Sequence, residues 1–364
     1  MHNAILAPGR SVARALSARL ARKALHLALA LTGLVFVPCA PVHAAEIEVT
    51  IGLTNSATDV GFFIADKRGY FREAGIRPKF ILFDSAARMN SLFGSGDLDV
   101  GAGGMSAGLY NAIARGIDIR IVADKNSTPP GRSSQKLLVR KDLVDSGRFK
   151  SLADLKGMRI ATSAPGTAAM GTLVKILEKA GLKRDDVDEV HMSFSQMVLA
   201  ISNKAVDAAL PAEPQATQAM EAGAVKVISD DEIYPDHQIS AVLYSGQFAK
   251  KDPALATRFL KAYLRGVRDH NDSLVDGKFA GPKGDAVVTI LTEYSLVKDP
   301  AVHRSFVLSA IHPDGKLDIP SMKQDLRIFR EAKLIEGKVE VEQGVDLSFL
   351  QAVLNELGPY KSAP

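Results

Sequence analysis

From Glu46 onward, the hydrophobic positions of the chain alternate between strand-like runs and helical spacing. The run EVTIGL at 48–53 is followed by a polar loop and by VGFFIADKRGYFREAGI at 60–76, whose apolar residues recur at helical spacing. A strand at 78–83, a helix at 85–96 and a strand at 98–104 come next. The pattern therefore predicts a β-α-β-α-β unit, in which the strands are mostly parallel and helices cover the sheet.

The same order returns later in the chain. It predicts strands at 158–162, 188–194 and 205–213, with helices at 167–182 and 195–204 between them. Gly75 in AGI and Gly181 in AGL are 106 residues apart, while Asp99 in LDV and Asp207 in VDA are 108 apart. Two landmarks at nearly one offset indicate that the unit is doubled.

The remainder of the chain predicts one returning strand and a series of amphipathic helices. ISAVLY at 239–244 is typical of a strand that rejoins the first sheet, and the later helices need that sheet to cover their apolar faces. The expected helices are 252–271, 284–296, 300–311, 320–334 and 347–357. We expect an α/β protein of two lobes joined by two crossovers: lobe 1 is residues 45–140 and 240–364, and lobe 2 is the inserted segment 141–239.

Residues 1–44 are typical of a secretory signal peptide. Five basic residues and no acid precede the apolar run ALHLALALTGLVFV, which is followed by APVHAA. Cleavage after Ala44 leaves Val42 and Ala44 at the two positions that a signal peptidase reads. Pro38 before Cys39 disfavours a lipid anchor there, and the alternatives are an uncleaved anchor or a mitochondrial presequence. We expect a periplasmic protein.

Composition excludes several kinds of chemistry. Cys39 is the only cysteine, so the exported chain would have neither a disulfide nor a thiol nucleophile. Without the five basic residues of the leader, the formal charge of +4 becomes −1, which does not indicate a nucleic-acid partner. The later histidines are dispersed and form no metal-binding motif, so no metal and no cofactor is expected.

Three loops are candidates for a ligand site because each follows a predicted strand and precedes a helix: TNSATDVGFF at 54–63, GAGGMSAG at 101–108 and SAPGTAAM at 163–170. Small and hydroxyl residues let backbone N–H groups approach a guest, and the helix N-terminus carries partial positive charge that suits an anion. Ordinary helix capping is the alternative for each loop. The candidate contacts are Thr54, Asn55, Ser56, Ser106, Ser163, Gly166, Thr167 and Ala168.

GMSAG at 104–108 matches the G-x-S-x-G motif of a hydrolase nucleophile elbow. The motif is short, and a doubled lobe plan does not match the single sheet of such hydrolases. We therefore interpret Ser106 as a helix-opening or ligand-contacting serine. A secreted serine hydrolase stays as the alternative.

Other polar and aromatic residues give less specific indications of function. Arg88 is expected at the surface, with a role in pairing an anion as the alternative. Asp230, Asp231 and Glu232 are expected in a solvated turn. The residues Phe62, Phe63 and Phe194 are expected in the core, with stacking on a ligand as the alternative.

Four segments together resemble the ABC-transporter substrate-binding proteins of the nitrate, taurine and sulfonate class. They are VGFFIADKRGYFREAGI, SLFGSGDLDVGAGG, SLADLKGMRIATSAPGTAA and AVDAALPAEPQA, and the resemblance covers about residues 46–350. It implies a type II periplasmic binding protein fold. By the same resemblance, the ligand contacts fall on Thr54 to Ser56, on Gly104, Met105 and Ser106, on Ser163 to Ala168, and on Glu213 with Pro214.

The resemblance also implies a function. It implies a monomeric, non-enzymatic protein that clamps a small anion (a sulfonate, nitrate or carboxylate) and delivers it to an inner-membrane permease with its ATPase. Glu213 would repel an anion, so a backbone or supporting role is expected there. Some members of the family bind pyrimidine precursors, and that ligand class is a further alternative.

Overall fold

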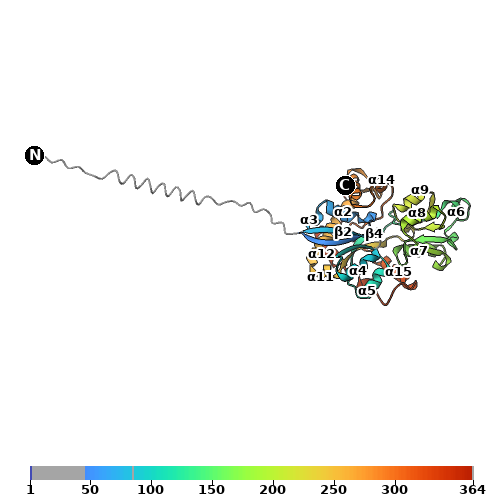
Figure 1. Ribbon diagram of the computed structural model, residues 1–364, viewed down its shortest axis with the longest axis horizontal. Helices are drawn as coiled ribbons and strands as arrows, with labels where there is room; N and C mark the ends of the chain where they lie inside the picture. Colours follow the sequence, from blue (N-terminus) through green and yellow to red (C-terminus); the bar gives the residue numbers. More distant parts are fainter. Residues whose placement is uncertain (2–45, 84–85, 363–364) are drawn as a thin grey trace. The chain divides into compact units, whose positions relative to one another are not determined.

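The computed structural model describes Met1, residues 46–83 and residues 86–362, and the signal peptide prediction therefore lies outside the described residues. The first sheet has the strand order β2-β1-β3-β10-β4, and Figure 1 labels its two edge strands, β2 and β4. Its strands are β1 (Ile47–Leu53), β2 (Ile76–Leu82), β3 (Val100–Gly104), β4 (Ile119–Thr128) and β10 (His237–Ser245). Strands β2, β1 and β3 pair in parallel, and β10 runs antiparallel to both of its neighbours.

The second sheet repeats this plan with the order β7-β6-β8-β5-β9. Its strands are β5 (Lys136–Arg140), β6 (Arg159–Thr162), β7 (Asp188–His191), β8 (Ala208–Ala209) and β9 (Ala224–Ser229). Here too three neighbouring strands are parallel, and β5 runs antiparallel to both of its neighbours. The doubled unit and the two-sheet fold predicted from the sequence are thus confirmed.

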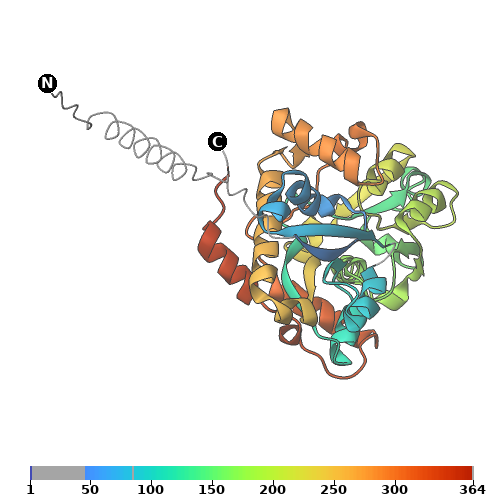
Figure 2. The same cartoon turned by 60° about the vertical axis from the view of Figure 1, so that its left-hand side comes forward.

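Both faces of the first sheet are covered, as the alternation of its buried residues shows. On β10, Val242 and Tyr244 belong to one core cluster, while Ala241 and Leu243 belong to the cluster on the opposite face. The first face packs against four helices: α2 (Val60–Lys67), α12 (Pro253–Asn271), α13 (Gly281–Tyr294) and α16 (Ser348–Leu357). The second packs against α4 (Met89–Ser95), α5 (Ala107–Ala114) and α15 (Ile319–Glu331). Figure 2 shows the C-terminal helix α16, in red, beside α12.

The remaining helices of the first half are α3 (Tyr70–Glu73), α4 (Met89–Ser95), η1 (Ala57–Asp59) and η2 (Ala86–Arg88). Those that follow β10 are α11 (Gly246–Lys251), α12 (Pro253–Asn271), α13 (Gly281–Tyr294), α14 (Pro300–Arg304), α15 (Ile319–Glu331), η5 (Val341–Gln343) and α16 (Ser348–Leu357), with a small hairpin of β11 (Leu274–Val275) and β12 (Lys278–Phe279).

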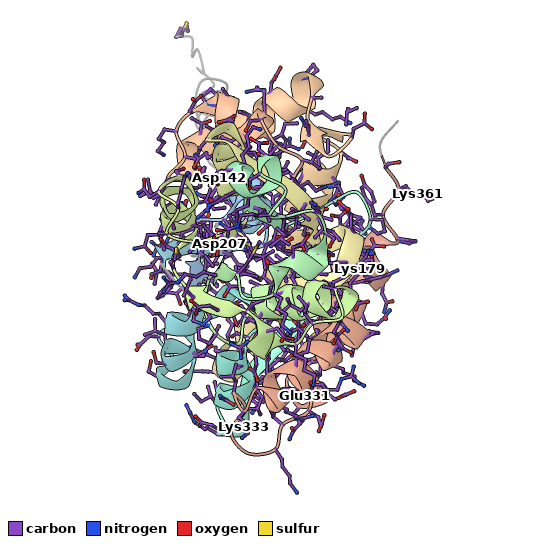
Figure 3. All side chains as sticks on the ribbon, turned by 90° about the vertical axis from the view of Figure 1, so that its right-hand side faces the viewer. Asp142, Lys179, Asp207, Glu331, Lys333 and Lys361 are labelled. Carbon is purple, nitrogen blue, oxygen red and sulfur yellow. The ribbon has the colours of Figure 1, made fainter. Side chains whose placement is uncertain are left out.

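The second sheet is covered in the same way. Leu137 and Val139 of β5 face one core cluster, which contains residues of α7, and Leu138 faces the other, which contains residues of α8 and α9. Its helices are α6 (Lys141–Asp145), η3 (Leu152–Leu155), α7 (Ala168–Lys179), η4 (Arg184–Asp186), α8 (Phe194–Ser202), α9 (Gln215–Glu221) and α10 (Asp230–Ile233). Figure 3 labels Asp142 and Asp207 on this part of the molecule, and Arg140 forms ion pairs with both.

Three predicted elements differ from the structure. The helix expected at 60–76 is interrupted at Gly69, whose φ of 76° is in the left-handed region that glycine adopts readily. The helix expected at 300–311 ends at Arg304, because Ala310 instead forms a β-bridge with Ser127. The predicted solvated turn at 230–232 is wrong for Asp230, which is fully buried. Its carboxylate accepts two backbone N–H groups, which offset the cost of removing it from solvent.

Candidate functional site

The three candidate loops lie at the carboxyl ends of parallel strands, as the sequence predicts. Residues 54–56 follow β1, residues 105 and 106 follow β3, and residues 163–167 follow β6. Strands β1 and β3 are neighbours in the first sheet, whereas β6 belongs to the second. The carboxyl edge of an open parallel sheet is where ligands usually bind in α/β proteins.

The structure brings two of these loops from different sheets into contact. The Ala107 N–H donates a hydrogen bond of 2.8 Å to the carbonyl oxygen of Gly166, and Ser106 and Thr167 form an antiparallel β-bridge. Gly166 has a φ of 62°, and a Cβ there would lie 2.7 Å from the Ala107 Cβ. Only glycine fits this junction without displacing one loop from the other.

Ser106 caps helix α5. Its Oγ accepts a hydrogen bond of 3.2 Å from the Leu109 N–H, and its φ of −157° is ordinary extended backbone rather than the strained turn of a nucleophile elbow. Among the residues that the structure describes, no hydrogen bond joins Ser106 to a histidine. The two residues before it are half-buried Gly104 and buried Met105, whose N–H bonds to the Ile239 carbonyl at 2.9 Å.

The loop after β6 is closed by its own hydroxyls. Thr167 Oγ1 donates to the Ala164 carbonyl at 3.0 Å, and Ser163 Oγ lies 3.4 Å from Thr167 Oγ1. Ala168, the first residue of α7, is buried. In this arrangement the Thr167 hydroxyl proton is used within the loop, and ligand contact by Ser163, Thr167 or Ala168 stays a prediction.

The loop after β1 is held from two sides. Asn55 has a φ of 54°, and its Oδ1 accepts the Leu296 N–H at 2.9 Å, which ties the loop to the segment after α13. Thr54 and Ser56 are half-buried. The Ser56 hydroxyl contacts a buried ammonium group that is not among the residues predicted from the sequence.

That group belongs to Lys125 on β4, whose side chain is 2% exposed. Its Nζ lies 2.9 Å from Asp59 Oδ1, 2.8 Å from Ser56 Oγ and 3.0 Å from Thr58 Oγ1. Lysine and aspartate are almost never fully buried unless they are paired. The polar stretch DKNS inside the apolar strand β4 was the signal available in the sequence.

Glu213 is engaged by protein groups on both carboxylate oxygens. One pairs with the ammonium of Lys136, and the other accepts the Thr217 N–H at 2.9 Å, near the start of α9. The preceding residue, Ala212, forms a β-bridge with Gln135. A supporting role for Glu213 stays a prediction. Arg88, at the end of η2, is exposed.

Within residues 46–83 and 86–362, histidine, cysteine, aspartate and glutamate side chains form no group of three or more that could hold a metal ion. None of the described helices combines the length and the apolarity needed to cross a bilayer.

The two sheets, their common strand order and the two passages of the chain between them define a class, the two-lobed type II periplasmic binding protein fold. Residues 57–272 match the family described as NMT1/THI5 like, and the chain belongs to that family.

Known proteins similar to this chain agree with this assignment. A protein of Brucella abortus (strain 2308), named a binding protein, is 29% identical over 245 residues, which is 66% of this chain and 70% of the relative. A protein of Escherichia coli (strain K12), named for binding aliphatic sulfonates, is 25% identical over 325 residues, or 87% and 95% of the two chains. The resemblance to substrate-binding proteins of the sulfonate class is thus confirmed.

Solved structures share the fold. The periplasmic aliphatic sulphonate binding protein SsuA from Escherichia coli superposes with a TM-score of 0.65 at 19% identity, covering 83% of this chain and 92% of SsuA. The desulfurization enzyme DSZB also has this fold, with a TM-score of 0.58 at 17% identity over 85% of this chain and 99% of the enzyme. The fold alone therefore does not separate binding from catalysis.

Proposed function

We propose that this protein is the periplasmic solute-binding component of an ABC importer. It binds a small organic or inorganic anion between its two sheets and delivers it to an inner-membrane permease with its ATPase. The observation that carries the proposal is the junction of the Ser106–Ala107 and Gly166–Thr167 segments, which joins the carboxyl edges of the two sheets. A ligand held at that junction touches both lobes.

The lobe division belongs to the same proposal. The chain leaves the first sheet after β4, enters the second at β5, and returns at β10. We therefore place the two crossovers in residues 129–135 and 230–236. They lie a few residues before the boundaries at 140 and 239 that the sequence suggested.

Hydroxyl and backbone N–H groups dominate the candidate loops, and such groups suit an oxyanion. The relative named for aliphatic sulfonates supports a sulfonate among the possible anions. Hydrogen bonds to a charged group are worth about 1.5–3 kcal/mol each, so four of them contribute about 6–12 kcal/mol, a range that includes the roughly 8 kcal/mol of micromolar binding before ordering costs are subtracted.

The proposal is tested by thermal shift and calorimetry on protein recovered from the periplasm. The probes are ethanesulfonate, nitrate, bicarbonate, benzoate and a pyrimidine. We expect one of the anions to raise the melting temperature and to be recovered unchanged, and we expect the recovered chain to begin at Ala45. Binding of the pyrimidine alone would favour the pyrimidine-precursor alternative. Labelling by a fluorophosphonate that Ser106→Ala abolishes would favour a hydrolase.

A further inference from the structure

Ser56 is fixed by two buried charges. Asp59 Oδ2 accepts the Ser56 N–H at 2.9 Å, and the ammonium of Lys125 lies 2.8 Å from Ser56 Oγ. Both charged side chains are almost fully removed from solvent, at 0% and 2% exposure, and they neutralise each other. The backbone and the side chain of Ser56 are thus each held by one member of the pair.

The ammonium group of Lys125 has little capacity to bind a ligand directly, because three protein groups already contact it. An ammonium group carries three N–H donors and no acceptor. Two of these N–H groups donate to Ser56 Oγ and Thr58 Oγ1. The ammonium also forms an ion pair with Asp59 Oδ1, although this contact does not have the geometry of a hydrogen bond. With three partners within 3.0 Å, Lys125 is positioned to act on a ligand through its neighbours.

The positions of the hydroxyl protons determine whether Ser56 offers a ligand a hydrogen-bond donor or an acceptor. Ser56 Oγ and Thr58 Oγ1 are 3.0 Å apart, so one hydroxyl donates to the other. Thr58 is buried at 5% exposure, whereas Ser56 is half-buried at the carboxyl edge of the first sheet. Among the residues that the structure describes, the buried Thr58 hydroxyl has no acceptor other than Ser56 Oγ, so Thr58 donates to Ser56. The Ser56 oxygen then accepts from both Thr58 and Lys125, and its own O–H is left to donate outward.

From this geometry we propose that Lys125 is a positioning residue that makes Ser56 an obligate hydrogen-bond donor to the ligand. The ammonium occupies the acceptor side of Ser56 and polarises its O–H, which strengthens a bond to an anionic oxygen. The position therefore selects an acceptor group, such as a sulfonate, nitrate or carboxylate oxygen, and rejects a ligand N–H. This inference rests on the proposed function and specifies one contact of its site.

The test is a mutant cycle measured for both affinity and stability. Removing Lys125 alone leaves Asp59 as an unpaired buried carboxylate and endangers folding. The pair is therefore replaced together, as Lys125→Met with Asp59→Asn, since the asparagine oxygen still accepts the Ser56 N–H. Ser56→Ala is made alone and in that background, and Thr58→Val serves as the matched control that removes a hydroxyl but leaves Lys125 and Ser56 in contact.

Calorimetry uses ethanesulfonate, nitrate and benzoate as probes. We expect Ser56→Ala and the paired change each to weaken the bound probe about tenfold or more. In the Ser56→Ala background, the paired change should weaken probe binding no further, although it should still alter the denaturation midpoint. A merely structural role of the pair would not make the affinity losses non-additive in this way. Thr58→Val should change the affinity less than Ser56→Ala.

Each other result has one meaning. If the wild type binds neither these three probes nor bicarbonate, the proposed function fails and this inference fails with it. If the wild type binds a probe but Ser56→Ala keeps its affinity, only the inference fails. Affinity losses that add in the combined variant would show that Lys125 does not act through Ser56.

Discussion

At the scale of single residues, burial couples several ionisable side chains to folding. Burial raises the pKa of Asp124 to about 6 and that of Asp230 to about 7, although both carboxylates accept hydrogen bonds. For a carboxylate with a raised pKa, the folded state binds more protons, so stability falls as pH rises from about 4 to the folded value. A buried histidine has the opposite effect.

That histidine is His270, on α12. Burial, aided by the nearby charge of Arg132, lowers its pKa from 6.5 to about 3, and its ring packs edge-on against Phe279. Below pH 6.5 only the unfolded chain takes up this proton. The His270 contribution to stability is therefore complete above pH 6.5 and is lost as the pH falls toward 3.

We predict that His270→Leu lowers the slope of the stability curve on its acid side. One proton fewer separates the two states between pH 6 and 4, so the slope of the unfolding free energy against pH should decrease by about 1.4 kcal/mol per unit. Urea unfolding at half-unit steps of pH measures both curves. Parallel curves for the wild type and the variant over this range would contradict the prediction.

At the scale of elements, helix α7 of the second sheet packs against α15, which covers the first sheet. The contact depends on Gly171, where an added Cβ would lie 2.3 Å from Asp325 Oδ1. The Asp325 carboxylate is fully buried and pairs with His237 at 2.7 Å, so it cannot move away without breaking that pair. The two helices therefore approach each other only while residue 171 has no side chain.

We predict that Gly171→Ala destabilises the protein by about 1–3 kcal/mol, the usual cost of overpacking a core. Gly108→Ala is the matched control, because a Cβ at that helical position meets no atom closer than 3.6 Å. The control should be neutral or stabilising by up to about 1 kcal/mol, since alanine favours helix. Denaturant unfolding measures both variants, and equal changes would show that the Asp325 contact is not the cause.

Gly171 also illustrates what the sequence could and could not reveal. The helix around it and the doubled strand order were predictable, because they depend on local periodicity. The reason for the glycine was not predictable, since Asp325 lies far along the chain. The candidate loops were found by their place after strands, but Lys125 was missed because its partners Ser56 and Asp59 lie in another segment. Pairing of Ala310 with Ser127 likewise ended a helix that periodicity alone had extended.

At the scale of the whole described fold, the two crossovers, residues 129–135 and 230–236, are joined to each other by hydrogen bonds. Asp230, in the second, accepts the N–H groups of Ser134 and Gln135, in the first, at 3.0 and 2.9 Å. Asp231 adds a bond from the Gly131 N–H at 2.9 Å. We infer that the crossovers move as one unit, so that relative motion of the sheets opens or closes the junction at Gly166.

The last prediction concerns that junction. In Gly166→Val the new Cβ would lie 2.7 Å from the Ala107 Cβ and 3.3 Å from Leu334, and it would hold the two loops apart. In the proposed function the ligand binds to the closed arrangement, so the apparent affinity should fall in proportion to the population of that arrangement, by about tenfold or more. Calorimetry with the anion found by the screen measures this loss.

Gly181→Val is the control that separates the steric effect of a side chain at the junction from the strain of a left-handed backbone. Gly181 has a φ of 71°, close to the 62° of Gly166, but a Cβ there meets nothing within 4 Å. Both variants should lose about 1–2 kcal/mol of stability from the left-handed backbone, yet only Gly166→Val should lose affinity. Without ligand, X-ray scattering should give a larger radius of gyration for Gly166→Val than for Gly181→Val. Equal affinities and equal radii would mean that the Ala107–Gly166 contact does not control closure, and that the ligand is held elsewhere.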